Sequence, residues 1–164
     1  MIRAALLLAL AAPAAAQAAT LTVEGLGAPQ PFDAAALAAL PAATAGIDAH
    51  GKKLDCTGVW LADLLAKAGA PAGDKLRGPL LAGTVTAMAR DGYRVTFSLG
   101  EIDKSLGKAP VLVATQCNGA PLGEDGPYRL IVSGDSRPAR AARMIERLVV
   151  SLPAVPAAKD AQKH

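Results

Sequence analysis

The two cysteines, Cys56 and Cys117, are the side chains of this sequence best suited to redox chemistry or metal binding. Two thiols can form a disulfide in an oxidising compartment, or they can stay reduced as small buried side chains. A metal or redox site is a third interpretation, but the sequence has no C-x-x-C spacing and only two histidines. A disulfide between Cys56 and Cys117 and a pair of buried thiols therefore both stay open.

His50 and Trp60 have rings that could contact a flat heterocyclic ligand. His50 precedes Gly51 at a predicted strand break, where a neutral imidazole could donate or accept a hydrogen bond, or simply be solvated. Trp60 is the only tryptophan and stands at the start of the clearest predicted helix, where it could stack on a ring or anchor the core. For Tyr93 and Tyr128 the sequence favours burial.

A group of arginines near the end of the sequence could bind an anion. Arg137, Arg140 and Arg143 recur at every third position, so they share one face of a helical or 3₁₀ turn. Their guanidinium groups suit phosphate or carboxylate, and the alternative is a solvated basic face. Asp135, just ahead of them, could accept hydrogen bonds from the amino group and ring N–H of a pterin, or could cap the turn.

The elements that must position these side chains are short strands with a few short helices. Alternating or apolar residues predict strands over 21–24, 44–49, 52–57, 84–90, 93–98, 111–116, 128–133 and 145–152. Asp91-Gly92 predicts a hairpin turn between the strands 84–90 and 93–98. Helices are predicted over 34–40, with Asp33 as N-cap, and over 60–68, ending at Gly69, with a turn of helix over 99–104. This mixture predicts an α+β fold with antiparallel or mixed strands.

Length and composition narrow the class of protein. The chain has 164 residues, which suits one domain with a core of its own. It has 17 Lys and Arg against 14 Asp and Glu, a net charge of +3 without a long block of one sign, which argues against disorder. Only 3% of the residues are aromatic and no basic stripe is present, so nucleic acid is not an expected partner.

The first 18 residues have the pattern of a secretory signal peptide. A positive start at Arg3 is followed by an apolar stretch over 4–12 and by small residues over 13–18, with Ala16-Gln17-Ala18 as the cleavage signal. The apolar stretch is shorter than the roughly 20 residues that span a bilayer, and a twin-arginine signal is absent. We therefore expect a domain over 19–152 and a flexible tail over 153–164, periplasmic or secreted and not membrane-spanning after cleavage.

Five segments together resemble the molybdopterin-binding domain of the sulfite oxidase family, in its small stand-alone exported form. They are His50-Gly51, 58–65 (GVWLADLL), 91–95 (DGYRV), 118–122 (NGAPL) and 126–132 (GPYRLIV). The resemblance runs from about residue 21 to residue 152. It implies a mixed α+β sandwich or barrel-like domain, in agreement with the elements predicted above.

The resemblance does not extend to the metal ligand. Catalytic members of this family bind molybdenum through a cysteine thiolate that lies well upstream of the Gly-Val-x-Leu helix start. Cys56 lies only two residues before Gly58, and Cys117 lies directly before Asn118, so neither cysteine matches the ligand position. The sequence also lacks the dimerisation and haem domains of the larger enzymes. These departures make enzymatic activity uncertain.

What the resemblance implies is a periplasmic pterin-binding module without chemistry of its own. Small relatives of this type bind free reduced pterins and report them to a membrane signalling partner, so a signalling or redox partner protein is expected. No tightly bound cofactor is expected, with a reduced pterin as ligand and molybdopterin as the alternative. The rival functions are a molybdopterin-dependent oxidoreductase and a degenerate domain that serves as an assembly surface.

In the family the ligand lies in a cleft between loops at strand ends. The resemblance therefore implies that five residues converge on one ligand site: His50, Trp60, Asp135, Arg137 and Arg140. In that site an aromatic face would stack on the ring, a carboxylate would accept from its N–H groups, and the arginines would meet hydroxyls or a phosphate.

Overall fold

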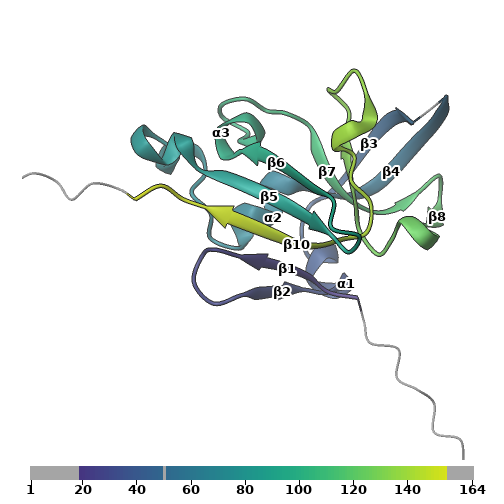
Figure 1. Cartoon of the computed structure of the whole chain (residues 1–164), viewed down its shortest axis with the longest axis horizontal. Coiled ribbons are helices and arrows are strands. Elements are labelled where there is room, and N and C mark those ends of the chain that lie inside the picture. The colour runs from purple at the N-terminus through teal and green to yellow at the C-terminus, as the bar shows by residue number, and fades with distance from the viewer. Residues whose placement is uncertain (1–18, 50, 155–164) are drawn as a thin grey trace, which may run out of the picture.

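Two β-sheets of short strands make up the structure, a computed structural model that describes residues 19–49 and 51–154 (Figure 1). One sheet has the strand order β2-β1-β10-β5-β6. The other has the order β3-β4-β7-β8, with β9 also paired to β7. With mainly antiparallel pairing and a few short helices, the structure confirms the predicted α+β class.

The first sheet joins both ends of the described chain. Its strands are β1 (Leu21–Glu24), β2 (Gln30–Phe32), β10 (Ile145–Ser151), β5 (Thr84–Ala89) and β6 (Arg94–Ser98). β1 and β10 run parallel to each other, and the other pairs of this sheet are antiparallel. The Asp91-Gly92 turn joins β5 to β6 as predicted, and Gly92 takes a φ of +87°, which glycine adopts without steric cost.

The second sheet curls around a small core of its own. Its strands are β3 (Ala42–Ala49), β4 (Lys52–Trp60), β7 (Val111–Cys117), β8 (Ala120–Pro121) and β9 (Arg129–Val132). All its pairs are antiparallel, and β3 also contacts β9. The enclosed core consists of Ala43, Cys56, Leu112, Ala114 and Ile131. A Cβ on Gly58 would overlap the Val113 carbonyl, so β4 and β7 can approach this closely only with glycine there.

In the part of the chain that the structure describes, three short helices connect the strands: α1 (Ala34–Ala38), α2 (Leu61–Lys67) and α3 (Leu99–Ile102). Asp33 caps α1 as predicted, its side chain accepting from the Ala36 N–H at 2.8 Å. α2 begins after the extended Trp60 and ends before Gly69, whose φ is +97°. Four 3₁₀ turns lie in the loops: η1 (Gly73–Lys75), η2 (Gly78–Ala82), η3 (Gly123–Asp125) and η4 (Pro138–Arg140).

The main core lies between the first sheet, α2 and the second sheet. Its fully buried large side chains include Leu21, Leu61, Leu64, Phe97, Leu130, Ile145 and Leu148. Each such leucine or isoleucine contributes roughly 1.5–3 kcal/mol through the apolar surface that it removes from water. This core fixes the sheets, and thereby the loops at their ends.

Most of the predicted elements are present, with differences at the boundaries. β2 and β8 were not predicted, because runs of 3 and 2 residues are too short to show an alternation. Tyr128 is buried as expected, but the prediction of burial is wrong for Tyr93, which is 48% exposed. Among the described residues no helix has both the length and the apolarity needed to cross a bilayer. The predicted signal peptide and His50 lie outside the described residues.

Candidate functional site

A cavity of about 580 Å³ opens between the β3–β4 hairpin, the β5–β6 turn and the segment around η4. Its polar lining consists of Lys52, Asp91, Tyr93, Asp125, Arg129 and Arg143. Cavities of about 300–1,000 Å³ with a few convergent polar groups are typical of small-molecule sites. We take this cavity, called the Arg129 cavity below, as the candidate functional site.

Two arginines share one carboxylate in this cavity. Arg129 donates from Nη1 to Asp125 Oδ2 at 2.6 Å, and Arg143 donates from Nη1 to Asp125 Oδ1 at 3.1 Å. Lys52 lines the same cavity and forms no ion pair with any described residue. The three cations outnumber the two carboxylates of the lining, Asp91 and Asp125, so the site favours a ligand with an anionic or electronegative group.

Arg129 is an unusual residue for its position. It belongs to β9, whose four residues are all buried, and it is only 7% exposed. Its Nε is buried and has no hydrogen-bond partner among the described residues. Burial lowers the pKa of the Arg129 guanidinium, which Asp125 opposes and Arg143 reinforces. A buried N–H without an acceptor costs about 1–3 kcal/mol, so Arg129 occupies this position at a cost in stability.

Backbone pairing brings Asp125 and Arg143 together although they are far apart in sequence. The Met144 N–H donates to the Asp125 carbonyl at 2.9 Å, and the Leu130 N–H donates to the Ala142 carbonyl at 2.8 Å. The segment before β10 therefore lies along the segment that leads into β9. This pairing fixes the distance between the two arginines and the carboxylate they share.

Tyr93 links the β5–β6 hairpin to η4 across the cavity rim. Its hydroxyl donates to the Ala139 carbonyl at 2.7 Å, and its backbone N–H donates to Asp91 Oδ1 at 2.9 Å. The exposed ring of Tyr93 also lines the cavity. A flat ligand would therefore meet an aromatic side chain at this rim.

Of the residues predicted to converge, Asp135 and Arg140 do meet, but as partners of each other. Arg140 donates to Asp135 through Nε at 2.9 Å and through Nη2 at 2.6 Å, and it also donates to Glu101 at 2.9 Å. Its guanidinium carbon lies 4.8 Å from the centre of the Phe97 ring. Arg140 therefore ties the loop after β9 to α3, and its donors are largely occupied.

Trp60 and Arg137 do not join that pair. Trp60 lines a cavity of about 210 Å³ with Pro110, whereas Asp135 lines one of about 300 Å³, and these two cavities share no lining residue. Arg137 is exposed at the start of η4. Trp60 and Asp135 therefore do not line one common cavity, although Trp60 and the end of β9 lie at the same end of the second sheet. The structure does not describe His50, which follows Ala49 on the wall of the Arg129 cavity.

The two cysteines are bonded to each other. Cys56 on β4 and Cys117 on β7 are directly paired residues of adjacent antiparallel strands, with Cα atoms 4.0 Å apart, and they form a disulfide. Cys56 is buried in the small core of the second sheet. Neither cysteine is a free thiol in this structure.

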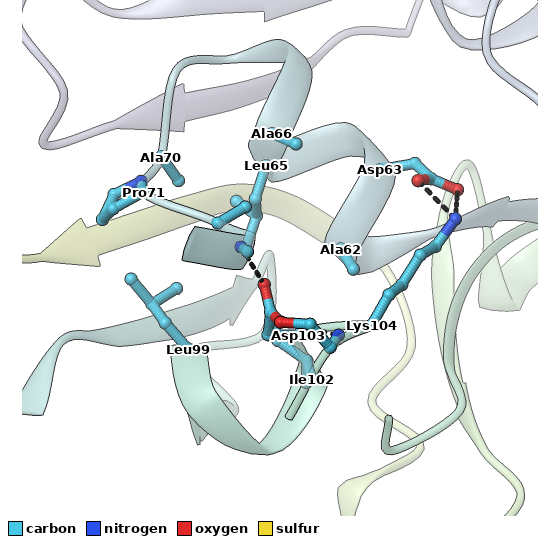
Figure 2. Close-up of a pocket in the computed structure, with 13 residues that line it drawn as sticks. Ala62, Asp63, Leu65, Ala66, Ala70, Pro71, Leu99, Ile102, Asp103 and Lys104 are labelled. Carbon is cyan, nitrogen blue, oxygen red and sulfur yellow. Dashed lines mark hydrogen bonds and ion pairs between the residues drawn. The ribbon is translucent and has the colours of Figure 1, made fainter. Parts of the chain in front are cut away.

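Another cavity, of about 180 Å³, lies between α2 and α3 (Figure 2). Figure 2 shows apolar side chains on its walls, among them Leu65, Leu99 and Ile102, with the Asp63–Lys104 ion pair at one edge. The single buried carboxylate, Asp103, accepts from the Gly73 and Ser105 N–H groups. Its acceptors are thus occupied, and this cavity offers no comparable polar chemistry.

The Asp135–Arg140 pair makes stability sensitive to acid. Hydrogen bonding from Arg140 lowers the pKa of the Asp135 carboxyl despite its partial burial. A carboxyl with a lowered pKa in the folded state stabilises the fold above the unfolded pKa, about 3.9, and loses that contribution as pH falls below it. We therefore expect Asp135→Asn to be less stable than wild type by about 1 kcal/mol at pH 7. In urea titrations the difference between the two proteins should shrink as the pH falls below about 3.9; a difference that stays unchanged as the pH is lowered would contradict this account.

Comparison with solved structures identifies the architecture. The sulfane dehydrogenase SoxCD from Paracoccus pantotrophus superimposes on 85% of this chain with a TM-score of 0.61 and 22% sequence identity. SoxCD is a sulfite-oxidase-family protein. This chain has the sulfite-oxidase fold. It spans 39% of the matched SoxCD chain. No protein-family model matches the sequence, and no curated protein sequence matches it significantly.

The cysteines of this chain do not fit the molybdenum ligand of the sulfite-oxidase fold. The sequence contains only Cys56 and Cys117, and both sulfurs are used in the disulfide. Within residues 19–49 and 51–154, no group of three or more His, Cys, Asp or Glu side chains could hold a metal ion. The disulfide therefore leaves no cysteine thiolate to bind molybdenum.

Sequence reasoning missed the residues of the Arg129 cavity. The signal for Arg129 was available: it is a charged residue inside the apolar run of 128–132, where every neighbour is expected to face the core. Lys52, next to a predicted turn, gave no such signal. Asp125 becomes a candidate only once its pairing with two arginines is known.

Proposed function

We propose that this chain is a periplasmic pterin-binding module of the sulfite-oxidase fold that acts through a partner protein and has no redox chemistry of its own. The observation that carries the proposal is a cavity whose wall brings together three cationic side chains, Lys52, Arg129 and Arg143, with an exposed tyrosine, Tyr93. A pterin supplies what this cavity can bind: ring oxygen and nitrogen acceptors, N–H donors and a flat face.

Each polar group of the cavity has a role in this proposal. The guanidinium of Arg129, which lines the cavity, donates to an acceptor of the pterin ring. The exposed Tyr93 ring flanks the flat face. Lys52 and Arg143 meet the hydroxyls or the phosphate of the ligand side chain. His50 and Arg137, close in sequence to the lining residues Ala49 and Pro138, are further candidates for ligand contact.

The disulfide supports binding without a cysteine–metal bond, since it occupies both sulfurs of the chain. The rival function, a molybdopterin-dependent oxidoreductase, would need a different ligand for the metal. Elemental analysis of the protein as purified separates the two functions. Stoichiometric molybdenum would contradict the proposal.

Adjacent lysines provide a matched test of the site. Lys52 lines the Arg129 cavity, whereas Lys53 lines the neighbouring cavity beside Asp135, which shares only Pro138 with it. We expect Lys52→Met to weaken binding of a tetrahydropterin about 3- to 10-fold, because it removes one charge-assisted hydrogen bond that is partly exposed to solvent. Lys53→Met should leave the affinity unchanged. The measurement is anaerobic titration calorimetry on the full protein, with circular dichroism to verify folding.

Arg129→Met is the stronger variant at the same site. Removing a buried charged donor should weaken binding about 10- to 150-fold, and it also removes a partner of Asp125. Wild-type protein that binds no reduced pterin would refute the proposed function. Equal affinities for the Lys52→Met and Lys53→Met variants would refute the assigned cavity.

A further inference from the structure

Exposed leucines gather around α3, at the end of the molecule away from the Arg129 cavity. Leu81 on η2 and Leu106 after α3 are 47% and 48% exposed, and both lie against Gly100, within 4.0 Å of where its Cβ would be. Leu152, 39% exposed, lies with Leu99 beside Gly83. Figure 1 shows α3 and the C-terminal end of β10 toward the same end of the first sheet, at the left of the view. Leu81, Leu106 and Leu152 are called the leucine patch below.

Cations flank the leucine patch. Leu106 lies between Lys104 and Lys108 in the sequence, and Arg77 and Lys75 precede Leu81. Lys75, Arg77 and Lys108 have no ion-pair partner among the described residues, whereas Lys104 pairs with Asp63. Asp74 is the one exposed acidic residue in these two segments. The surroundings of the patch are therefore basic.

We propose that the leucine patch docks on the surface of an anionic phospholipid membrane. Exposed apolar side chains among lysines and arginines combine the two terms that hold a protein at such a surface: apolar burial at the level of the headgroups and attraction to anionic lipid. Three of the four exposed large hydrophobic side chains of the described residues belong to this one patch. Single exposed leucines are ordinary, but a cluster of this kind marks an interaction site.

The charges favour a membrane over a second copy of this chain. A two-fold dimer through the leucine patch would bring Arg77 and Lys108 of one copy close to the same cations of the other, and like charges repel. The leucines of the patch are exposed and are not among the residues that line the neighbouring cavity in Figure 2. Exposed leucines outside a cavity are free to insert into a deformable lipid surface.

Vesicle sedimentation tests the proposal. The exported form of the protein is used, with its N-terminus determined by mass spectrometry, so that any apolar leader is accounted for. We expect binding to vesicles of phosphatidylglycerol and phosphatidylcholine, weaker binding at high salt, and no binding to pure phosphatidylcholine.

Two pairs of substitutions separate the contribution of the cations to vesicle binding from that of the leucines. Arg77→Gln with Lys108→Gln should weaken binding about 25-fold, since each cation near an anionic surface contributes about fivefold. Leu81→Ser with Leu106→Ser should weaken it about 10-fold. The control pair, Lys53→Gln with Arg94→Gln, removes the same charge from β4 and from the far end of β6, and should leave binding unchanged.

Three outcomes would overturn the proposal. The first is wild-type protein that does not sediment with anionic vesicles. The second is an equal loss of binding from the charge pair and from its control pair, which would show attraction through net charge alone. The third is concentration-dependent dimerisation in sedimentation velocity that the Leu81→Ser, Leu106→Ser protein has lost, which would assign the patch to a second copy of this chain.

Discussion

Replacing Cys56 and Cys117 together by alanine lowers the free energy of unfolding by about 4 kcal/mol. The disulfide joins residues 61 positions apart and closes a loop that contains α2, β5, β6 and α3. Opening such a loop gives the unfolded chain many more conformations, and the chain-entropy estimate grows with the logarithm of loop length. Guanidinium titration of the oxidised wild type and the double variant measures the difference.

The reduced wild-type protein is the control for packing. Cys56 is buried in the small core of the second sheet, so alanine also removes a sulfur atom from a packed site. Wild type in a reducing agent keeps both sulfurs and loses only the cross-link, and it should account for most of the loss. If reduction leaves the unfolding midpoint where it is, the cross-link contributes little and the effect of the variant comes from packing.

Replacing Phe97 by alanine lowers the free energy of unfolding by about 3–5 kcal/mol. Phe97 is 1% exposed and is among the largest fully buried side chains. Its ring lies in the main core and also under the Arg140 guanidinium. Alanine removes apolar contacts, leaves a cavity and takes away the support of the residue that ties the loop after β9 to α3.

Phe97→Leu separates the stability that comes from the apolar volume of the side chain from the stability that comes from the contact between its ring and Arg140. Leucine keeps most of the apolar volume, so this variant should lose less than half as much stability as Phe97→Ala. It lacks the ring, so adding Arg140→Leu should cost less in the Phe97→Leu protein than in wild type. Fully additive effects of the two substitutions in urea titrations would contradict an interaction between Arg140 and the ring.

The parts of the fold that the sequence predicts are those set by local pattern. The Asp91-Gly92 turn between alternating runs predicts the β5–β6 hairpin, and apolar spacing with Gly69 predicts α2. The parallel pairing of β1 with β10 joins residues more than a hundred positions apart and leaves no local signal. The disulfide likewise has no local sequence signal, since it depends on the register of β4 against β7.

The arginines show why the candidate site was harder to predict than the fold. Their three-residue spacing predicts one shared basic face, but η4 ends at Arg140 and the chain then pairs with β9. As a result Arg137 stays exposed, Arg140 binds Asp135 and Glu101, and Arg143 binds Asp125. Which carboxylate each arginine meets depends on loops whose course no sequence period describes.

The position of β10 in the first sheet decides when this protein can fold. β10 lies between β1 and β5, so β1–β2 and β5–β6 are two unconnected hairpins until residues 145–151 have been synthesised. A two-stranded hairpin alone is only marginally stable in water. A nascent chain therefore cannot complete this sheet early in translation, and it stays in a state that can be handed to chaperones or to a translocation channel before its core closes.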